Sequence, residues 1–137
     1  MKSSNALIIQ SGGSTAVINR SLAGILTESL KLRSFSKIYG AIHGTNGLLK
    51  RNITDLSNIS SSEISLIAET PGAALGSSRY KITKSDASNI LNVLSDFQIA
   101  YLFIIGGNDS AANVKELGRL SKYNGYKLQV IHVPKTI

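Results

Sequence analysis

Two glycine pairs, Gly12-Gly13 and Gly106-Gly107, each lie between an apolar stretch and a helical pattern. At such a turn, backbone N–H groups that no Cβ obstructs and the positive end of a helix dipole can bind phosphate. The two pairs therefore indicate a phosphorylated ligand. Glycine at a strand-to-helix turn is about as often present only for tight geometry, and neither loop has the spacing GxxxxGKS, GxxxxGKT or GxGxxG.

The second glycine pair is followed by Asn108, Asp109 and Ser110, all of which can meet a charged ligand. Asp109 would be an acid in the first helical turn, where the dipole favours it with or without a ligand. Asn108 could cap the turn, and its amide oxygen could equally bind a hard cation, although less well than a carboxylate would. These residue types alone leave both interpretations open.

Two further segments carry candidate binding groups. Arg79 follows a Leu-Gly-Ser-Ser stretch, and a guanidinium can bind phosphate through two parallel hydrogen bonds or form a surface ion pair. Lys135 and Thr136 follow an apolar stretch that ends at a proline. A lysine there could stabilise a transferring phosphoryl group or be solvated, and the threonine hydroxyl could serve a ligand or the backbone.

The elements that would position these residues alternate between strands and helices. Short apolar runs predict strands at 5–10, 37–41, 99–105 and 128–133, and the run at 99–105 should be a central strand buried on both faces. Residues 43–47 have turn chemistry, and the stretch between 48 and 80 is the hardest to assign.

Helices are predicted between the strands from apolar side chains that recur every three or four residues. The first should start at a Ser14 or Thr15 cap and run to about residue 32. A capping box at 60–63 marks another helix start, and a further helix covers 87–97 after a Thr83 or Ser85 cap. The last follows Gly107 and ends near residues 124–125.

This alternation predicts an α/β fold, a Rossmann-like open and mainly parallel sheet with helices on both faces. In such sheets ligands bind at the carboxyl ends of the strands. The loops after residues 10, 105 and 133 all start at that edge, so the candidate residues should meet there. A length of 137 residues suits one domain with a sizeable core.

The composition limits which binding partners and which cellular compartment we expect. The chain is 42% hydrophobic and 17% charged, and its net charge of +7 comes from scattered basic residues without a nucleic-acid motif. With no cysteine and two histidines, disulfides and an all-protein zinc site are not expected. The apolar run at 6–9 is too short for a signal peptide or a membrane span, so we expect a cytoplasmic protein that binds neither nucleic acid nor membrane.

Five segments, taken in order, make the chain resemble the phosphofructokinase family. They are Gly12 to Asn19, Tyr39-Gly40-Ala41, Thr70-Pro71-Gly72 to Arg79, Gly106 to Ser110, and Pro134-Lys135-Thr136-Ile137. The resemblance covers essentially all of residues 1–137 and corresponds to the amino-terminal, donor-binding part of a phosphofructokinase-like domain. It therefore implies an incomplete phosphofructokinase-type sheet.

Asp109 and Lys135 make the chain similar to the branch of the family that uses pyrophosphate, since ATP users have glycine at both positions. A carboxylate at Asp109 would lie where an ATP α-phosphate must go, and two like charges about 4 Å apart repel by about 4 kcal/mol at an effective dielectric of about 20. Lys135 would stabilise the charge of the transferring phosphoryl group. The resemblance thus implies that these two residues are catalytic and select the donor.

The resemblance also implies roles for the remaining site residues. Donor phosphates would be bound by a set of five residues: Gly12, Gly13, Arg79, Gly107 and Ser110. Thr136 and Ile137 would contact the sugar phosphate. Asn108 stands where many family members have a magnesium-binding aspartate, so Mg²⁺ is expected with pyrophosphate, although an amide is a weaker ligand. His43 and His132 match no catalytic position and are expected to be structural or solvated.

The implied reaction is phosphoryl transfer from pyrophosphate to fructose 6-phosphate, giving fructose 1,6-bisphosphate in glycolysis. In the family the Thr-Ile pair is followed by an Asp-Asn-Asp sequence that contains the catalytic base, so residues 1–137 alone should turn over negligibly. The full-length protein should be a homo-oligomer. The alternatives are a non-catalytic phosphate-binding or regulatory fragment, an ATP-dependent phosphofructokinase, and a NAD or lipid kinase with a similar glycine loop.

Overall fold

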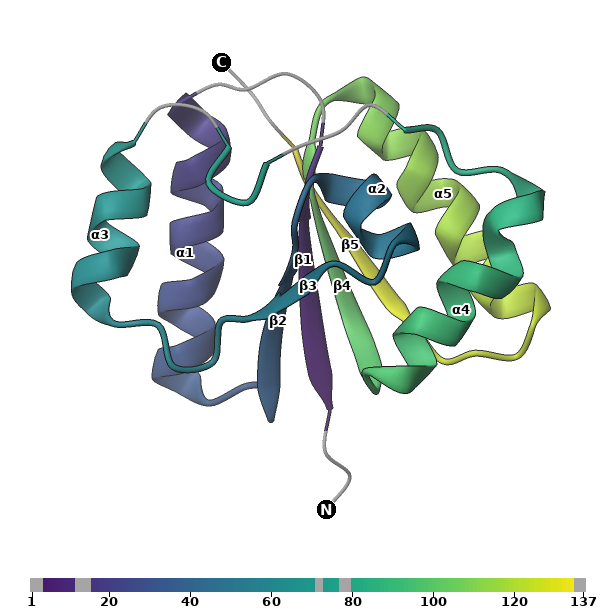
Figure 1. Cartoon of the computed structure of the whole chain (residues 1–137), viewed down its shortest axis with the longest axis horizontal. Helices are drawn as coiled ribbons and strands as arrows, with labels where there is room; N and C mark the ends of the chain where they lie inside the picture. Colours follow the sequence, from purple (N-terminus) through teal and green to yellow (C-terminus); the bar gives the residue numbers. More distant parts are fainter. Residues whose placement is uncertain (1–3, 12–15, 71–72, 77–79, 135–137) are drawn as a thin grey trace.

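The chain forms a layered structure in which helices cover both faces of one sheet (Figure 1). The computed structural model describes residues 4–11, 16–70, 73–76 and 80–134, and for residues 16, 17, 108 and 109 the backbone alone. The elements in chain order are β1 (Asn5–Gln10), α1 (Ala16–Leu32), β2 (Lys37–Ala41), α2 (Gly44–Leu49), β3 (Ile53–Asp55), α3 (Ser61–Glu69), the 3-10 helix η1 (Lys84–Asp86), α4 (Ala87–Asp96), β4 (Ile99–Gly106), α5 (Asn108–Tyr123) and β5 (Gln129–Pro134).

The sheet is mainly parallel, as predicted. Its strand order is β3-β2-β1-β4-β5; β1 pairs in parallel with β2 and β4, and β4 pairs in parallel with β5. Only β3 runs antiparallel among the described strands, against β2. The middle of the sheet is β1, so the 99–105 run, predicted to be central, is the interior strand beside it. This arrangement confirms the open α/β fold class.

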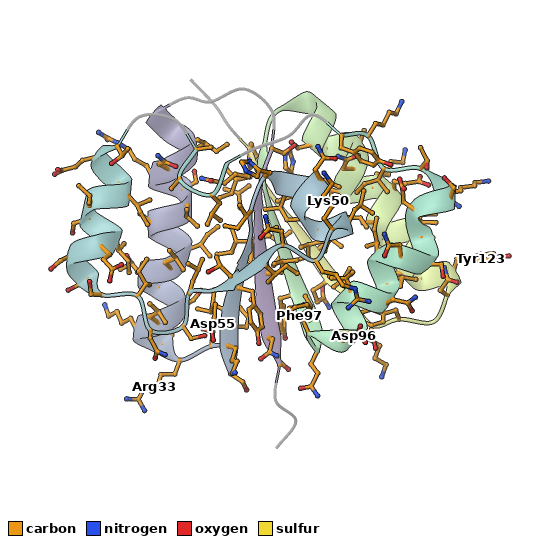
Figure 2. All side chains as sticks on the ribbon, in the orientation of Figure 1. Arg33, Lys50, Asp55, Asp96, Phe97 and Tyr123 are labelled. Carbon is orange, nitrogen blue, oxygen red and sulfur yellow. The ribbon has the colours of Figure 1, made fainter. Side chains whose placement is uncertain are left out.

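The core lies on both sides of β1, because successive side chains of a strand point to opposite faces. Leu7 and Ile9 pack with apolar side chains of α2, α4 and α5, whereas Ile8 packs with those of α1 and α3. Figure 2 shows side chains filling the space between the sheet and the helices on both sides, while the labelled Tyr123 projects outward. Across the described residues, every helix is too short or too polar to cross a membrane.

The middle of the chain differs from the sequence prediction. Residues 43–47, expected to be a turn, form a tight turn at His43 and Gly44, with φ of 66° and 61°, that leads directly into α2. Packing stabilises this glycine-containing helix, since Leu48 is fully buried. Strand β3 was not predicted either, because three partly exposed residues show no recognisable alternation.

Helix starts agree better with their sequence signals. Ser60 and Glu63 form the predicted capping box at the start of α3, with the Glu63 N–H donating to Ser60 Oγ at 3.1 Å. Thr83, one of the two candidate caps, caps η1 together with Asp86, and α4 follows directly. The expected caps of α1, Ser14 and Thr15, lie outside the described residues.

Candidate phosphate-binding site

The carboxyl ends of three neighbouring strands lie at one edge of the sheet. Gln10 of β1 is level with Ile105 of β4, which is level with Val133 of β5. The Ser11 N–H donates to Ile105 O at 2.9 Å, so the chain leaves β1 while still attached to β4. The segments that carry the predicted site residues therefore start from the same edge.

Several predicted site residues lie outside the described part of the chain. They are Gly12, Gly13, Arg79, Lys135, Thr136 and Ile137. The structure describes only residues next to them in the chain. Ser11 precedes Gly12-Gly13, Tyr80 follows Arg79, and Pro134 precedes Lys135. Ser11 and Pro134 are both at the carboxyl edge, with Pro134 level with Gly106.

The loop after β4 is the best-described part of the predicted site. Helix α5 begins at Asn108. The residue before it, Gly107, has no side chain that could cap the helix. The backbone of Asn108 and Asp109 thus lies in the first helical turn, as predicted, whereas their side chains lie outside the description. Unpaired backbone N–H groups and the dipole make a first turn of this kind attractive to anions.

Ser110 is buried against this loop. Its side chain is 1% exposed, and within the described structure its hydroxyl has no hydrogen-bond partner. Gly106 makes room for it, since a Cβ there would clash with Ser110 Oγ and lie 3.0 Å from Ser11 O. The ends of β1 and β4 and the start of α5 therefore meet around a buried hydroxyl group that has no hydrogen-bond partner in the described structure.

Two buried amide side chains attach the segment after α3 to this edge. Gln10 Nε2 donates to Asn19 Oδ1 at 3.1 Å, and both residues are fully buried. Gln10 Oε1 accepts the Leu75 N–H at 2.8 Å. Asn19 accepts the Ala74 N–H at 2.7 Å and donates to Thr70 O at 2.7 Å. These bonds hold Thr70, Ala74 and Leu75 beside the end of β1.

The residues after Arg79 are also held in place. The Tyr80 hydroxyl donates to both carboxylate oxygens of Asp86, at 2.9 Å each, and the Thr83 N–H donates to Asp86 Oδ2 at 2.9 Å. Burial raises the pKa of Asp86, but these hydrogen bonds outweigh it and hold the pKa below its usual value. The hydrogen bond to Asp86 raises the pKa of Tyr80.

Asn113 of α5 likewise accepts the Ile82 N–H at 3.0 Å and donates to Tyr80 O at 2.9 Å. The sequence analysis assigned no role to Gln10, Asn19 or Asn113. A signal was present: Gln10 ends an otherwise apolar buried strand, and Asn19 lies beside Ile18 on the buried face of α1. A polar residue at a position that should be apolar indicates a buried hydrogen-bond partner. The sequence did not show which backbone groups those partners would be.

The two histidines have structural surroundings. His132 Nε2 lies 3.1 Å from Gly106 O and so links β5 to the end of β4. His43 adopts a left-handed backbone conformation, and its N–H donates to Leu75 O at 2.8 Å. In the described part of the chain, His, Asp and Glu side chains do not gather in groups of three that could hold a metal ion.

Comparison with known proteins bears on this arrangement. The sequence profile of the phosphofructokinase family matches residues 5–137. The pyrophosphate–fructose 6-phosphate 1-phosphotransferase of Rhodospirillum rubrum is 40% identical over 131 residues, which is 96% of this chain and 32% of that protein. The chain spans about a third of the length of the curated relatives it matches, 32% and 34% for two of them.

Solved structures give the same result for the fold. A pyrophosphate-dependent phosphofructokinase from Marinobacter aquaeolei superimposes with a TM-score of 0.90 at 36% identity, covering 97% of this chain and 33% of that one. The corresponding protein from Nitrosospira multiformis gives a TM-score of 0.89 at 40% identity, covering 96% of this chain and 33% of that one. The fold described above is therefore shared with about a third of each of these proteins.

Proposed function

The chain belongs to the phosphofructokinase family, and we propose that it is the donor-binding part of a pyrophosphate-dependent 6-phosphofructokinase. In the proposed reaction, O1 of fructose 6-phosphate forms a bond to a phosphorus of pyrophosphate. The bond from that phosphorus to the bridging oxygen breaks, orthophosphate leaves, and a base takes the O1 proton. Residues 1–137 would contribute chiefly the groups that bind and orient the donor.

The observation that carries the proposal is the buried Ser110 hydroxyl in the first turn of α5. A buried hydroxyl without a partner costs stability, and a phosphate oxygen at the helix start would satisfy it. Gly12 and Gly13, which follow Ser11 at the same edge, would supply further backbone N–H groups. Arg79 would bind the same anion from the segment that precedes Tyr80.

The choice of donor rests on Asp109 and Lys135. Asp109 lies in the first turn of the same helix. Its carboxylate would repel the α-phosphate of ATP, whereas pyrophosphate has no third phosphate to place there. Lys135 follows Pro134, which is level with Gly106 in the sheet. In the proposed reaction its ammonium group would stabilise the charge of the transferring phosphoryl group.

The remaining partners of the proposed reaction follow from the same assignment. Thr136 and Ile137 would contact fructose 6-phosphate, and the whole protein would act in glycolysis in the cytoplasm as a homo-oligomer. Mg²⁺ would neutralise the donor, held mainly by phosphate oxygens and water. Asn108 could add an amide oxygen, but the described residues alone form no cluster suited to the ion.

A calorimetric titration of the purified protein with pyrophosphate and with ATP tests the proposal. We expect pyrophosphate to bind at least about tenfold more tightly, because each 1.4 kcal/mol of the repulsion at Asp109 corresponds to about a factor of ten. The double substitution Asp109→Gly with Lys135→Gly should reduce the preference for pyrophosphate over ATP.

A matched pair of variants isolates the charge effect. Asp109→Asn should raise ATP affinity, whereas Asp96→Asn should not, because Asp96 is an exposed residue of α4 that pairs with Arg51 at 2.5 Å. Equal affinity of the unmodified protein for ATP and pyrophosphate would refute the donor assignment. Failure to bind either anion would refute the donor site itself.

A further inference from the structure

The side chain of His132, in β5, bonds to the end of the neighbouring strand β4. Its Nε2 lies 3.1 Å from Gly106 O. A carbonyl oxygen only accepts hydrogen bonds, so Nε2 must carry the proton, and Nδ1 of the neutral ring is left as an acceptor. The half-buried His132 therefore donates to the last residue of β4, which lies 26 positions earlier in the chain.

This bond is made on the face of the sheet that α5 covers. Successive residues of a strand alternate between the two faces, so His132 shares its face with Val130, which packs against the core cluster on the α4–α5 side. Helix α5 packs against both β4 and β5 (Figure 1). His132 thus lies beneath α5 and bonds to Gly106 at the point where the chain leaves β4 to start that helix.

Gly106 touches the hydroxyl group that carries the proposed donor site. Its backbone lies so close to Ser110 Oγ that a Cβ on Gly106 would overlap this oxygen. The Ser110 backbone is attached to the same loop, since Gly107 O accepts the N–H groups of Ser110 at 3.1 Å and of Ala111 at 3.3 Å. Gly106 O and the nitrogen of Gly107 belong to one planar peptide group, so they move together. A shift of Gly106 would therefore displace the buried Ser110 hydroxyl.

We propose that His132 is a positioning residue of the donor site, which sets the location of the Ser110 hydroxyl through Gly106. The proposal rests on the donor site proposed above. Because glycine has the widest range of backbone conformations, the Gly106-Gly107 pair does not fix its own geometry. The hydrogen bond from β5 supplies a restraint at this pair. Groups that bind a ligand must be held to within about 0.5 Å of their productive positions, so the loss of this restraint should weaken binding.

Two amide substitutions separate the hydrogen bond from the polarity of the side chain. The amide nitrogen of glutamine roughly reproduces the position of Nε2, whereas that of asparagine roughly reproduces Nδ1 and is too short to reach Gly106 O. We expect His132→Asn to weaken pyrophosphate binding about tenfold in calorimetry, and His132→Gln to bind within about threefold of the unmodified protein. Equal affinities of these two variants would overturn the proposal.

A double-mutant cycle tests whether His132 acts through the Ser110 hydroxyl. In the Ser110→Ala background, His132→Asn should change the affinity less than about twofold, because the group that it positions is gone. Losses of equal size in both backgrounds would contradict the proposed role.

Tyr126→Phe is the matched control, since the Tyr126 hydroxyl donates to Ile99 O at 2.5 Å and so bonds to the opposite end of β4. This variant should be less stable and bind pyrophosphate as the unmodified protein does. A tenfold weaker affinity here would show that any lost contact to β4 affects binding, and the specific role of His132 would be refuted.

The hydrogen bond can also be checked without ligand or substitution. In nitrogen NMR spectra of the unmodified protein, the neutral ring of His132 should carry its proton on Nε2, and this proton should exchange slowly with water. A ring protonated on Nδ1 would overturn the proposal even if the variants failed to fold.

The binding data distinguish the two proposals. If the unmodified protein binds no pyrophosphate, the donor site fails and the positioning role fails with it. If the unmodified protein binds pyrophosphate and His132→Asn binds it equally well, the donor site stands and only the positioning role is refuted.

Discussion

Replacing Ser110 with alanine should stabilise the free protein and weaken ligand binding, which are opposite effects of one change. The hydroxyl is 1% exposed and has no hydrogen-bond partner among the described residues. A buried polar group in that condition costs about 1–3 kcal/mol, and alanine is also the better helix former. We therefore expect the free energy of unfolding to rise by about 1 kcal/mol, or the Tm by about 3 °C.

Binding should change in the other direction. A hydrogen bond to a charged group contributes about 1.5–3 kcal/mol, so its loss should weaken pyrophosphate binding by about tenfold to a hundredfold. Urea unfolding followed by circular dichroism gives the first quantity, and calorimetric titration gives the second. Both can be measured on the same preparation.

Ser121→Ala is the matched control for this experiment. Ser121 lies in the same helix and is 3% exposed, but its hydroxyl donates to Gly118 O at 3.0 Å. Its removal should lower stability by about 1 kcal/mol and leave binding unchanged. If Ser110→Ala behaved like this control, with lower stability and unaltered affinity, the hydroxyl would have a structural role and the reasoning about the phosphate site would be wrong.

Two other substitutions test the stability of the scaffold. Gly118→Ala should raise the urea midpoint by the equivalent of about 0.5–1 kcal/mol, because an added Cβ meets no atom within 4 Å and alanine favours the helix; a lower midpoint would contradict this. Hydrogen bonds from Ser57 lower the pKa of Asp55 below the ordinary value of an aspartate. The stability gained is present above that value and lost as the pH falls through the lower, folded-state pKa. Asp55→Asn should therefore be less stable than the unmodified protein at neutral pH, and the two unfolding curves should converge as the pH falls through the lowered, folded-state pKa; a difference independent of pH would refute this.

The order and type of most elements could be predicted from local patterns. The apolar strand Asn5–Gln10 and the helix ending at Leu32 have the predicted positions because burial imposes a period on the residues themselves. The capping box at Ser60 is equally local, since both of its partners lie within one helical turn. The failures at α2 and β3 concern short elements whose stability comes from packing partners far away in the sequence.

For the candidate site too, local sequence patterns predict one part and only the tertiary structure decides the other. The residue types and spacing of the two glycine pairs, Asp109 and Ser110 predict a phosphate-binding site at one edge of the sheet, because parallel strands bring their carboxyl ends together. The burial of the Ser110 hydroxyl and the hydrogen bonds of Gln10, Asn19 and Asn113 were decided only by the tertiary structure. Their partners on the segments around the site include backbone N–H groups 31 and 65 positions away along the chain, and a backbone group has the same chemistry in every residue except proline. No sequence pattern can therefore name the partner that folding brings to a buried amide.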